Sequence, residues 1–380
     1  MSIASPAPAP GDLFAALLRG ETIPWAAFAM PPTEFVRTCN DQRLAGLIYE
    51  RLRMFPEGCD WPRSIRDTLA HDVRAQAAQE LLHHKELHSV VSALAAESLS
   101  VIFLKGTALA YSVYDAPSSR PRIDTDLLVR RDEVNRIRHV MAGMGYTAPL
   151  LCEGDLLFCQ FPLQKTTNVG VVHTFDCHWK ISTQSVFADV LTFDEAAARA
   201  TALPPLGAHA RALAPLDALL LACIHPVMHH RNAESLIWLF DIHLLASALS
   251  EQEFERFAEM AIAKRVSLIC AHQLAAARTK LGTRIPEEAI REMTRGRQRE
   301  SSAVYLRANR RWLDELMWSI RGLSRWSDRL RLVREVVVPG RAYMLKAYGF
   351  ERSRVGVALL PLFYLHRLLV GGWKLFAGRK

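Results

Sequence analysis

Apolar residues recur at three- and four-residue spacing along most of this chain, and that spacing predicts helices. Two such stretches, residues 34–54 and 65–96, fill most of the N-terminal hundred residues. From Leu216 onward the pattern is helical throughout. The helices predicted there cover residues 216–230, 235–249, 251–280 and, with interruptions, 287–318.

Short apolar, β-branched runs replace the helical spacing in the middle of the chain and predict strands. Helices are predicted between them over residues 107–114 and 132–144. We expect the last two strands to pair as antiparallel neighbours. The predicted strands cover residues 100–104, 123–129, 156–163 and 170–181.

The order of these elements predicts an α+β fold, in which a small mixed β-sheet is flanked by N-terminal helices and a C-terminal helical domain. With 380 residues, half of them hydrophobic, the chain can bury a sizeable core and is not a disordered protein. The predicted parts are an N-terminal helical region (1–97), an α+β core (98–200), a helical domain (201–350) and a basic apolar tail (351–380).

Cysteine usage and the N-terminal residues indicate where the protein resides. Seven scattered cysteines form no CxxC pair, which argues against a zinc ribbon or a thioredoxin-type redox site. Their odd number favours a reducing compartment. The Pro- and Ala-rich start lacks the basic residues and the apolar run of a secretory signal. We therefore expect a cytoplasmic protein.

The net charge of +8 is unevenly distributed. Residues 291–380 contain 20 Lys and Arg against 7 Asp and Glu, a net charge of +13. The preceding 290 residues contain 27 basic and 32 acidic side chains, a net charge of −5. A basic C-terminal quarter suggests an anionic partner, such as nucleic acid, lipid head groups or a phosphorylated substrate. A solvated arginine-rich face is the alternative.

Residues 355–377 are apolar enough to raise the question of a membrane span. Arg367 lies near the middle of this segment, where a charged side chain costs about 2.5–3.5 kcal/mol in the bilayer. An interfacial helix with its basic residues toward lipid phosphates fits the charge better, and would hold the protein at the inner face of the membrane. A helix packed on the rest of the molecule explains the pattern equally well.

Two aspartates stand two positions apart in the predicted strand 123–129. Asp124 and Asp126 would share one face about 7 Å apart, and their like charges need neutralising among apolar neighbours. A divalent cation does this, and oxygen ligands suit Mg²⁺ or Mn²⁺. Asp176, on the strand 170–181, is the third candidate ligand, and His178 shares its face.

The turn that follows the strand 100–104 has the features of a phosphate site. Gly106 lets the backbone approach a phosphate closely, because it has no Cβ. Thr107 contributes a hydroxyl, and the N–H groups at the start of the next helix favour an anion. Lys105 and Arg120 add positive charge suited to a triphosphate.

Together these motifs resemble the DNA polymerase β nucleotidyltransferase superfamily. A helical stretch with His229, Trp238 and Asp241 adds to the likeness, which covers residues 81–348. Thr125 departs from the family pattern, since an apolar residue is usual there and a buried hydroxyl needs a partner. Three stretches resemble, more narrowly, the bacterial family described as uncharacterised nucleotidyltransferase: Leu104-Lys105-Gly106, Arg120-Pro121-x-x-Asp124-x-Asp126 and Asp176-x-His178-Trp179.

The resemblance implies magnesium-dependent transfer of a nucleoside monophosphate from an NTP to an acceptor hydroxyl, with release of pyrophosphate. Asp124 and Asp126 would hold the metal, and Asp176 would activate the acceptor or bind a second metal. Gly106 and Thr107 would hold the β- and γ-phosphates. The acceptor stays open among sugar, lipid, protein and RNA. The candidate substrate contacts are His178, His229 and Asp241.

Two other functions remain open. The chain could be a catalytically silent nucleotide-binding or scaffold protein of a polysaccharide-assembly system at the membrane surface. It could instead be a nucleic-acid-modifying transferase that binds phosphates through its basic C-terminal quarter. His225 and His229 are four apart on one helix face, but no HExxH arrangement supports zinc, and packing is their simpler role.

Overall fold

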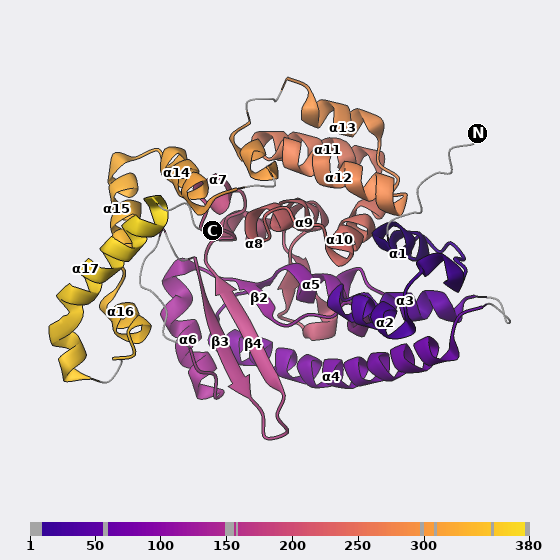
Figure 1. Cartoon of the computed structure of the whole chain (residues 1–380), viewed down its shortest axis with the longest axis horizontal. Helices are drawn as coiled ribbons and strands as arrows, with labels where there is room; N and C mark the ends of the chain where they lie inside the picture. Colours follow the sequence, from indigo (N-terminus) through magenta and orange to yellow (C-terminus); the bar gives the residue numbers. More distant parts are fainter. Residues whose placement is uncertain are drawn as a thin grey trace.

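The computed structural model describes residues 10–55, 60–148, 156, 159–296, 300–307, 310–350 and 353–376. It has an α+β fold with one mixed β-sheet, as the sequence predicts, and the sheet has six strands (Figure 1). Of the predicted elements, residues 157–158, 297–299, 308–309, 351–352 and 377–380 lie outside the described residues.

The sheet has the strand order β3-β4-β2-β1-β6-β5. The central strand β2 pairs antiparallel with β1 and parallel with β4, and β4 pairs antiparallel with β3 as predicted. At the other edge β6 pairs parallel with β1 and antiparallel with β5. The strands are β1 (Ile102–Phe103), β2 (Thr125–Leu128), β3 (Gln160–Thr166), β4 (Val172–His178), β5 (Thr201–Ala202) and β6 (Arg211–Ala212).

Alternation along the strands gives the sheet two different faces. Leu127 in β2, together with Phe175 and Cys177 in β4, packs against the helices α4 (Arg63–Ala96) and α6 (Val134–Gly143). On the opposite face, toward the C-terminal helices, lie the polar residues Asp126 in β2 and Asp176 and His178 in β4, with Leu128 packed into the core above them. The apolar alternation therefore orients the candidate site.

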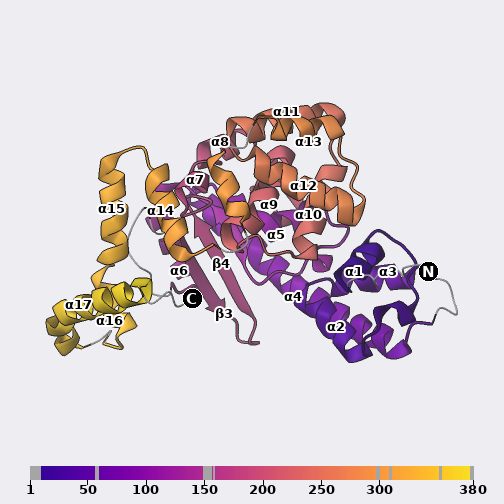
Figure 2. The same ribbon diagram turned by 45° about the horizontal axis from the view of Figure 1, so that its top comes forward.

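The N-terminal helices lie beside and beneath the sheet. The long helix α4 runs under it in both ribbon views, with the three shorter helices gathered at its N-terminal end (Figures 1 and 2). Phe14, Phe28, Phe35 and Trp61 form an aromatic cluster there. The shorter helices are α1 (Pro10–Leu18), α2 (Pro32–Asp41) and α3 (Ala45–Arg53).

The helices after the sheet form two groups. The first, above the polar face of the sheet, shares one continuous apolar core with the N-terminal helices. It contains α5 (Lys105–Ser112), which follows β1, and α7 (Ser185–Ala188), α8 (Phe193–Arg199), α9 (Pro215–His229), α10 (Leu236–Ser247), α11 (Glu251–Ala263), α12 (Ser267–Leu281) and α13 (Glu287–Thr294).

The second group forms a lobe at one end of the molecule, opposite α1–α3 (Figures 1 and 2). Among the helices that the structure describes, none combines the length and the apolar character needed to cross a bilayer. The lobe contains α14 (Trp312–Gly322), α15 (Trp326–Val337), α16 (Arg341–Ala347) and α17 (Arg354–Phe376).

Two stretches predicted as single helices are each broken in the structure. Residues 34–54 divide into α2 and α3, and residues 251–280 divide into α11 and α12. At the first break Arg43 has φ 58°, and at the second Arg265 has the same value, a left-handed conformation that ends a helix. The apolar spacing continues across each break because both helices pack on the same core, so spacing alone predicted one helix.

The strands β5 and β6 were not predicted from the sequence. Each has two residues, too short for alternation to show. They extend the sheet beyond the predicted core boundary at residue 200, since β5 begins at Thr201.

Replacing Arg265 by glycine is expected to stabilise the protein. The side chain is exposed, and a left-handed conformation costs a non-glycine residue about 1–2 kcal/mol, part of which the entropy of glycine offsets. Arg265→Gly should therefore raise the free energy of unfolding in urea by up to about 1 kcal/mol. A loss of stability would show that the Arg265 side chain, rather than its backbone, matters at this turn.

Candidate active site

The parallel pairing of β2 with β4 brings two aspartates together. Asp126 stands directly opposite Asp176 in the register, on the polar face of the sheet. His178, two residues further along β4, joins them. One ligand atom from each of these three side chains lies within 4.8 Å of the others, so the group could hold a metal ion.

Asp126 is the most strongly held side chain of this group. Its Oδ1 atom accepts hydrogen bonds from Lys105 Nζ and from His178 Nε2, both at 2.7 Å. Burial alone would raise the pKa of Asp126, but the Lys105 charge and the His178 hydrogen bond hold it well below its usual range. Asp126 is therefore an ionised carboxylate inside the protein.

The pKa values of Asp124 and Asp176 are raised, in contrast to that of Asp126. Asp124 lies just before β2, nearer to solvent than Asp126. Restricted hydration raises the pKa of Asp124, and the negative charges of Asp126 and Asp176 raise it further. Partial burial and Asp126 likewise raise the pKa of Asp176, which accepts a hydrogen bond from Gln160 Nε2 at 3.2 Å. We call these three aspartates the carboxylate cluster.

The donor set of the carboxylate cluster fits a divalent cation. Asp126 and Asp176 lie opposite each other, the charges of both raise the pKa of Asp124, and a cation would relieve the repulsion that raises the pKa of Asp124 and Asp176. The imidazole of His178 adds a nitrogen atom as a possible metal ligand. Its Nδ1 atom is buried and has no hydrogen-bond partner in the described residues. Oxygen-rich sites of this kind bind Mg²⁺ or Mn²⁺.

The start of α5 lies against the carboxylate cluster. The backbone N–H of Leu104 donates to the carbonyl oxygen of Asp126 at 3.0 Å, which positions the following Lys105 beside the Asp126 carboxylate. Lys105 has φ 49°, a strained conformation for a side chain that bears a Cβ. The first N–H groups of α5, including that of Gly106, have no helical partner and can bind an anion.

The two neighbours of Lys105 in the motif have different surroundings. A Cβ at Gly106 would lie 3.6 Å from the Arg120 guanidinium, which is ordinary contact, so the fold itself would accept alanine there. The buried hydroxyl of Thr107 donates to Thr125 Oγ1 at 3.3 Å. Thr125 thereby has the partner that its burial requires.

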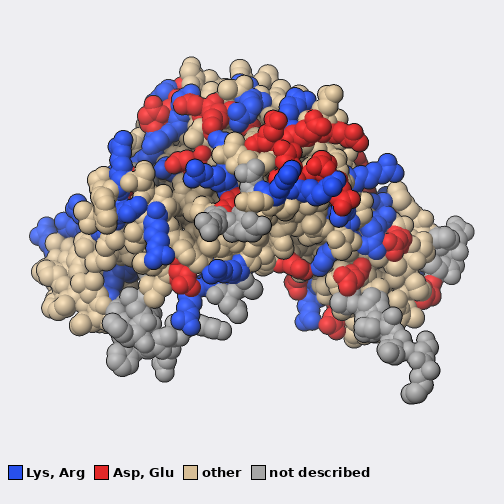
Figure 3. All heavy atoms as spheres, turned by 90° about the horizontal axis from the view of Figure 1, so that it is seen from above, with Lys and Arg blue, Asp and Glu red and all other residues tan. Residues whose placement is uncertain are grey.

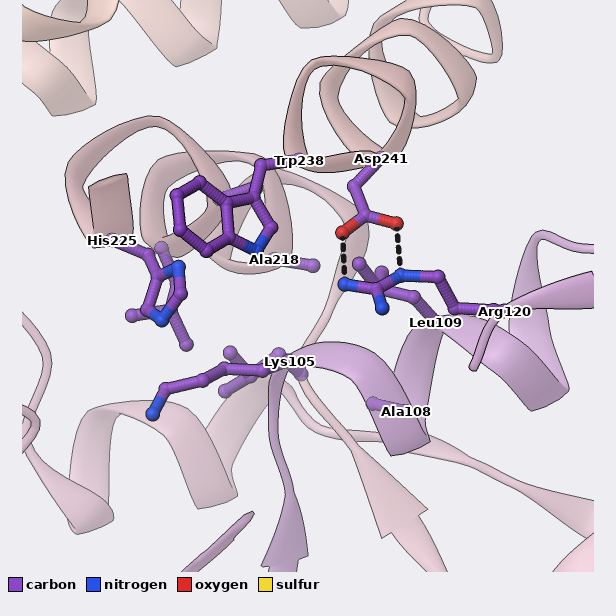
Figure 4. Close-up of a pocket in the computed structure, with 11 residues that line it drawn as sticks. Lys105, Ala108, Leu109, Arg120, Ala218, His225, Trp238 and Asp241 are labelled. Atoms are coloured by element: carbon purple, nitrogen blue, oxygen red, sulfur yellow. Dashed lines mark hydrogen bonds and ion pairs between the residues drawn. The ribbon is translucent and has the colours of Figure 1, made fainter. Parts of the chain in front are cut away.

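Arg120 and Asp241, both predicted as substrate contacts, bind each other. Arg120 Nε and Nη2 donate to the two oxygens of Asp241 at 2.8 and 2.7 Å, and Tyr114 donates its hydroxyl to Asp241 at 2.6 Å. Both charged side chains are buried. The pair joins the loop before β2 to α10, and it is the interaction drawn as dashed lines in Figure 4.

A small pocket of about 40 Å³ lies between this ion pair and Lys105. Figure 4 shows Lys105 extending beneath His225, with Trp238 beside that ring and the Arg120–Asp241 pair on the other side. His230 stacks on Trp238 with ring centroids 4.2 Å apart. Polar and aromatic side chains thus line a pocket that borders the carboxylate cluster.

The histidines of α9 are uncharged at neutral pH. Burial, the Lys105 charge and the neighbouring rings hold the pKa of His225 well below its usual range. Burial and Lys105 lower the pKa of His229 to about 4, and its Nε2 lies 3.3 Å from the carbonyl oxygen of Ile181. Neutral rings add no repulsion to the positive charge of Lys105.

Arg43 is a site residue that the sequence did not indicate. It lies in the turn between α2 and α3, half-buried, and no side-chain hydrogen bond or ion pair engages its guanidinium among the described residues. Burial and the Arg120 charge lower its pKa, whereas Asp124 raises it, so both charges lie within electrostatic range of Arg43. Nothing in the local pattern marks it, because only the fold brings the turn to the site.

Of the predicted site residues, the structure groups Lys105, Asp126, Asp176 and His178 most tightly. Asp124 borders this group, and Gly106 lies beside the Arg120 guanidinium. Arg120 and Asp241 form their own ion pair, and the Thr107 hydroxyl points to Thr125.

A comparison with protein families matches residues 29–282 to the family described as uncharacterised nucleotidyltransferase. The match starts earlier than the expected residue 81 and ends before residue 348. It contains every site residue described above and stops just after α12, so the lobe α14–α17 lies outside it. No curated protein matches the chain.

Substitution by asparagine should change the free energy of unfolding in opposite directions at Asp126 and at Asp176. Asp126→Asn weakens two hydrogen bonds to a charged group and should lower the free energy of unfolding by about 1.5–3 kcal/mol. A carboxyl whose pKa is raised on folding destabilises the folded protein above that pKa, and the penalty disappears as the pH falls through it. Asp176→Asn should therefore stabilise the protein at neutral pH but not at acidic pH.

Urea unfolding with a chelator present, at neutral and at acidic pH, measures both effects. If Asp176→Asn destabilises the protein at neutral pH as much as Asp126→Asn does, repulsion within the carboxylate cluster is not the dominant interaction at Asp176.

Breaking the Arg120–Asp241 pair should destabilise the protein strongly. Asp241→Asn leaves the buried Arg120 charge without a counterion, which costs about 3–5 kcal/mol. Replacing both residues together, as Arg120→Met with Asp241→Leu, should recover much of that loss in urea unfolding. A cost below about 1 kcal/mol for Asp241→Asn would show that water or another group compensates Arg120.

Proposed function

The chain belongs to the uncharacterised nucleotidyltransferase family, and on that basis we propose that it transfers a nucleoside monophosphate from an NTP to an acceptor hydroxyl. The observation that carries the proposal is the carboxylate cluster beside the N-terminus of α5. Carboxylates that can hold a divalent cation next to free backbone N–H groups suit a metal–triphosphate substrate.

In this proposal Asp124, Asp126 and Asp176 hold Mg²⁺ or Mn²⁺, with His178 adjoining them. The bound cation would neutralise phosphate charge and orient the α-phosphate for in-line displacement. Lys105 neutralises Asp126 in the cation-free protein, which explains how a buried carboxylate persists there.

The triphosphate would lie along the first turn of α5. The N–H groups of Gly106 and Thr107 face it, and the helix N-terminus favours negative charge. Arg43 supplies a guanidinium with no other partner in the described residues. Arg120 borders the same space, but two of its nitrogens are bound to Asp241, so we assign it mainly to positioning α10 against α5.

Asp176 is the proposed base for the acceptor. It lies opposite Asp126 in the strand register and is half-buried, so its carboxylate is placed within the site to accept a proton. The acceptor oxygen attacks the α-phosphorus, its proton passes to Asp176, and the bond to the β-phosphate oxygen breaks so that pyrophosphate leaves with the bonding electrons. His229 and the pocket beside Trp238 are proposed substrate contacts.

The class of acceptor is proposed only as a hydroxyl compound: a sugar, a lipid, a protein or an RNA. We further propose that the protein acts in the cytoplasm, at the inner face of the membrane. The net charge of +13 in residues 291–380 supports that location.

Calorimetric titration with each NTP and Mg²⁺ tests the proposal directly. The native protein should bind at least one NTP saturably, and Asp124→Asn/Asp176→Asn should lose that binding. This double variant keeps the Lys105–Asp126 pair, so it should stay folded. Release of pyrophosphate measures the reaction itself. If no NTP binds, the proposal fails, and NTP binding without pyrophosphate release favours a silent nucleotide-binding protein.

Arg43→Gly should lower NTP affinity by tenfold or more while raising the free energy of unfolding. The substitution relieves a left-handed arginine and removes one charge-assisted contact to phosphate, worth about 1.5–3 kcal/mol. Arg265→Gly is the matched control, because it relieves the same φ of 58° far along the chain from the site. Equal NTP affinity in both variants would show that Arg43 does not bind the nucleotide.

A further inference from the structure

The solvent-facing side of α17 is an apolar stripe. Val355, Leu362, Leu365 and Leu369 recur at helical spacing, and each is between 53% and 65% exposed. Ala358, also exposed, lies on the same face. Soluble surfaces rarely present contiguous apolar patches of this kind unless they bind something. We call these five residues the α17 stripe.

The opposite side of α17 is packed against the rest of the lobe. Phe363 stacks on Tyr348 with ring centroids 4.3 Å apart, and Tyr364 donates its hydroxyl to the carbonyl oxygen of Pro339 at 2.7 Å. Gly356 is buried so close to Phe350 that an added Cβ would lie 2.4 Å from the Phe350 side chain. These contacts set the rotation of the helix, so the α17 stripe cannot turn inward without breaking them.

Positive charge predominates in the part of the chain that carries the α17 stripe. Residues 336–376 contain six Lys and Arg and one acidic residue, and α17 itself contains no Asp or Glu. Lys346 and Arg354 are exposed close to the start of the helix, and Arg367 lies over the ring of Tyr343. In Figure 3 the lobe at the left edge is mostly tan, with Lys and Arg at its margin.

We propose that the α17 stripe is a docking surface for an anionic lipid bilayer, on which α17 lies in the plane of the interface. Apolar side chains enter the acyl boundary while lysines and arginines meet lipid phosphates. A second copy of this chain would bring two basic faces together, and like charges oppose that contact. The docking surface lies outside the residues matched to the family. The inference names the surface behind the membrane location proposed above, and it does not depend on nucleotidyl transfer.

Vesicle sedimentation of the full chain tests this inference. The native protein should bind vesicles of phosphatidylcholine with phosphatidylglycerol more tightly than vesicles of phosphatidylcholine alone, and salt should weaken the binding. Leu362→Glu/Leu369→Glu should lower the partition coefficient by at least about tenfold. The matched control is Met54→Glu/Leu81→Glu, two residues that are 76% and 72% exposed and lie outside the lobe, just after α3 and within α4.

Thermal unfolding and NTP titration of each variant show whether the body of the protein is intact. Vesicle binding that is lost only in the α17 stripe variant, with unchanged NTP binding, supports the docking surface. The inference is overturned if the native protein binds no anionic vesicles, or if the stripe variant binds them as the native protein does. It is also overturned if light scattering shows a native dimer that only the stripe variant loses.

Discussion

The ion pair between Lys105 and Asp126 organises the centre of this protein. It joins the first residue of α5 to the middle strand of the sheet, and His178 extends it to β4 through the same oxygen atom. A buried carboxylate would otherwise be strongly unfavourable. Two partners therefore keep the Asp126 charge inside the protein, and through them one oxygen atom links the start of α5 to two neighbouring strands.

Local patterns were sufficient to predict the strands that carry the aspartates. Asp124 and Asp126 precede or lie in a short apolar strand, and Asp176 lies in another, so alternation predicted both strands and the face that their carboxylates share. The α+β class and the family followed from the same motifs and are confirmed. These features are encoded within a few residues of chain.

What the sequence did not predict depends on contacts between distant residues. Arg43 reaches the site because α2 and α3 pack beside α4, and no spacing within residues 34–54 encodes that packing. Arg120 and Asp241 are separated by 121 positions, so no local pattern indicated that they form an ion pair. Each was therefore predicted to contact substrate. The strands β5 and β6 are two residues each, and they become strands only because β6 pairs with β1 and β5 pairs with β6.

The separation of Arg120 from Asp241 also has a consequence for synthesis on the ribosome. Arg120 and Tyr114 emerge long before Asp241, and burying the arginine without its counterion is unfavourable. The strands around the site therefore cannot close over Arg120 until α10 has left the exit tunnel. We therefore expect the carboxylate cluster and the helical domain to be completed together during synthesis.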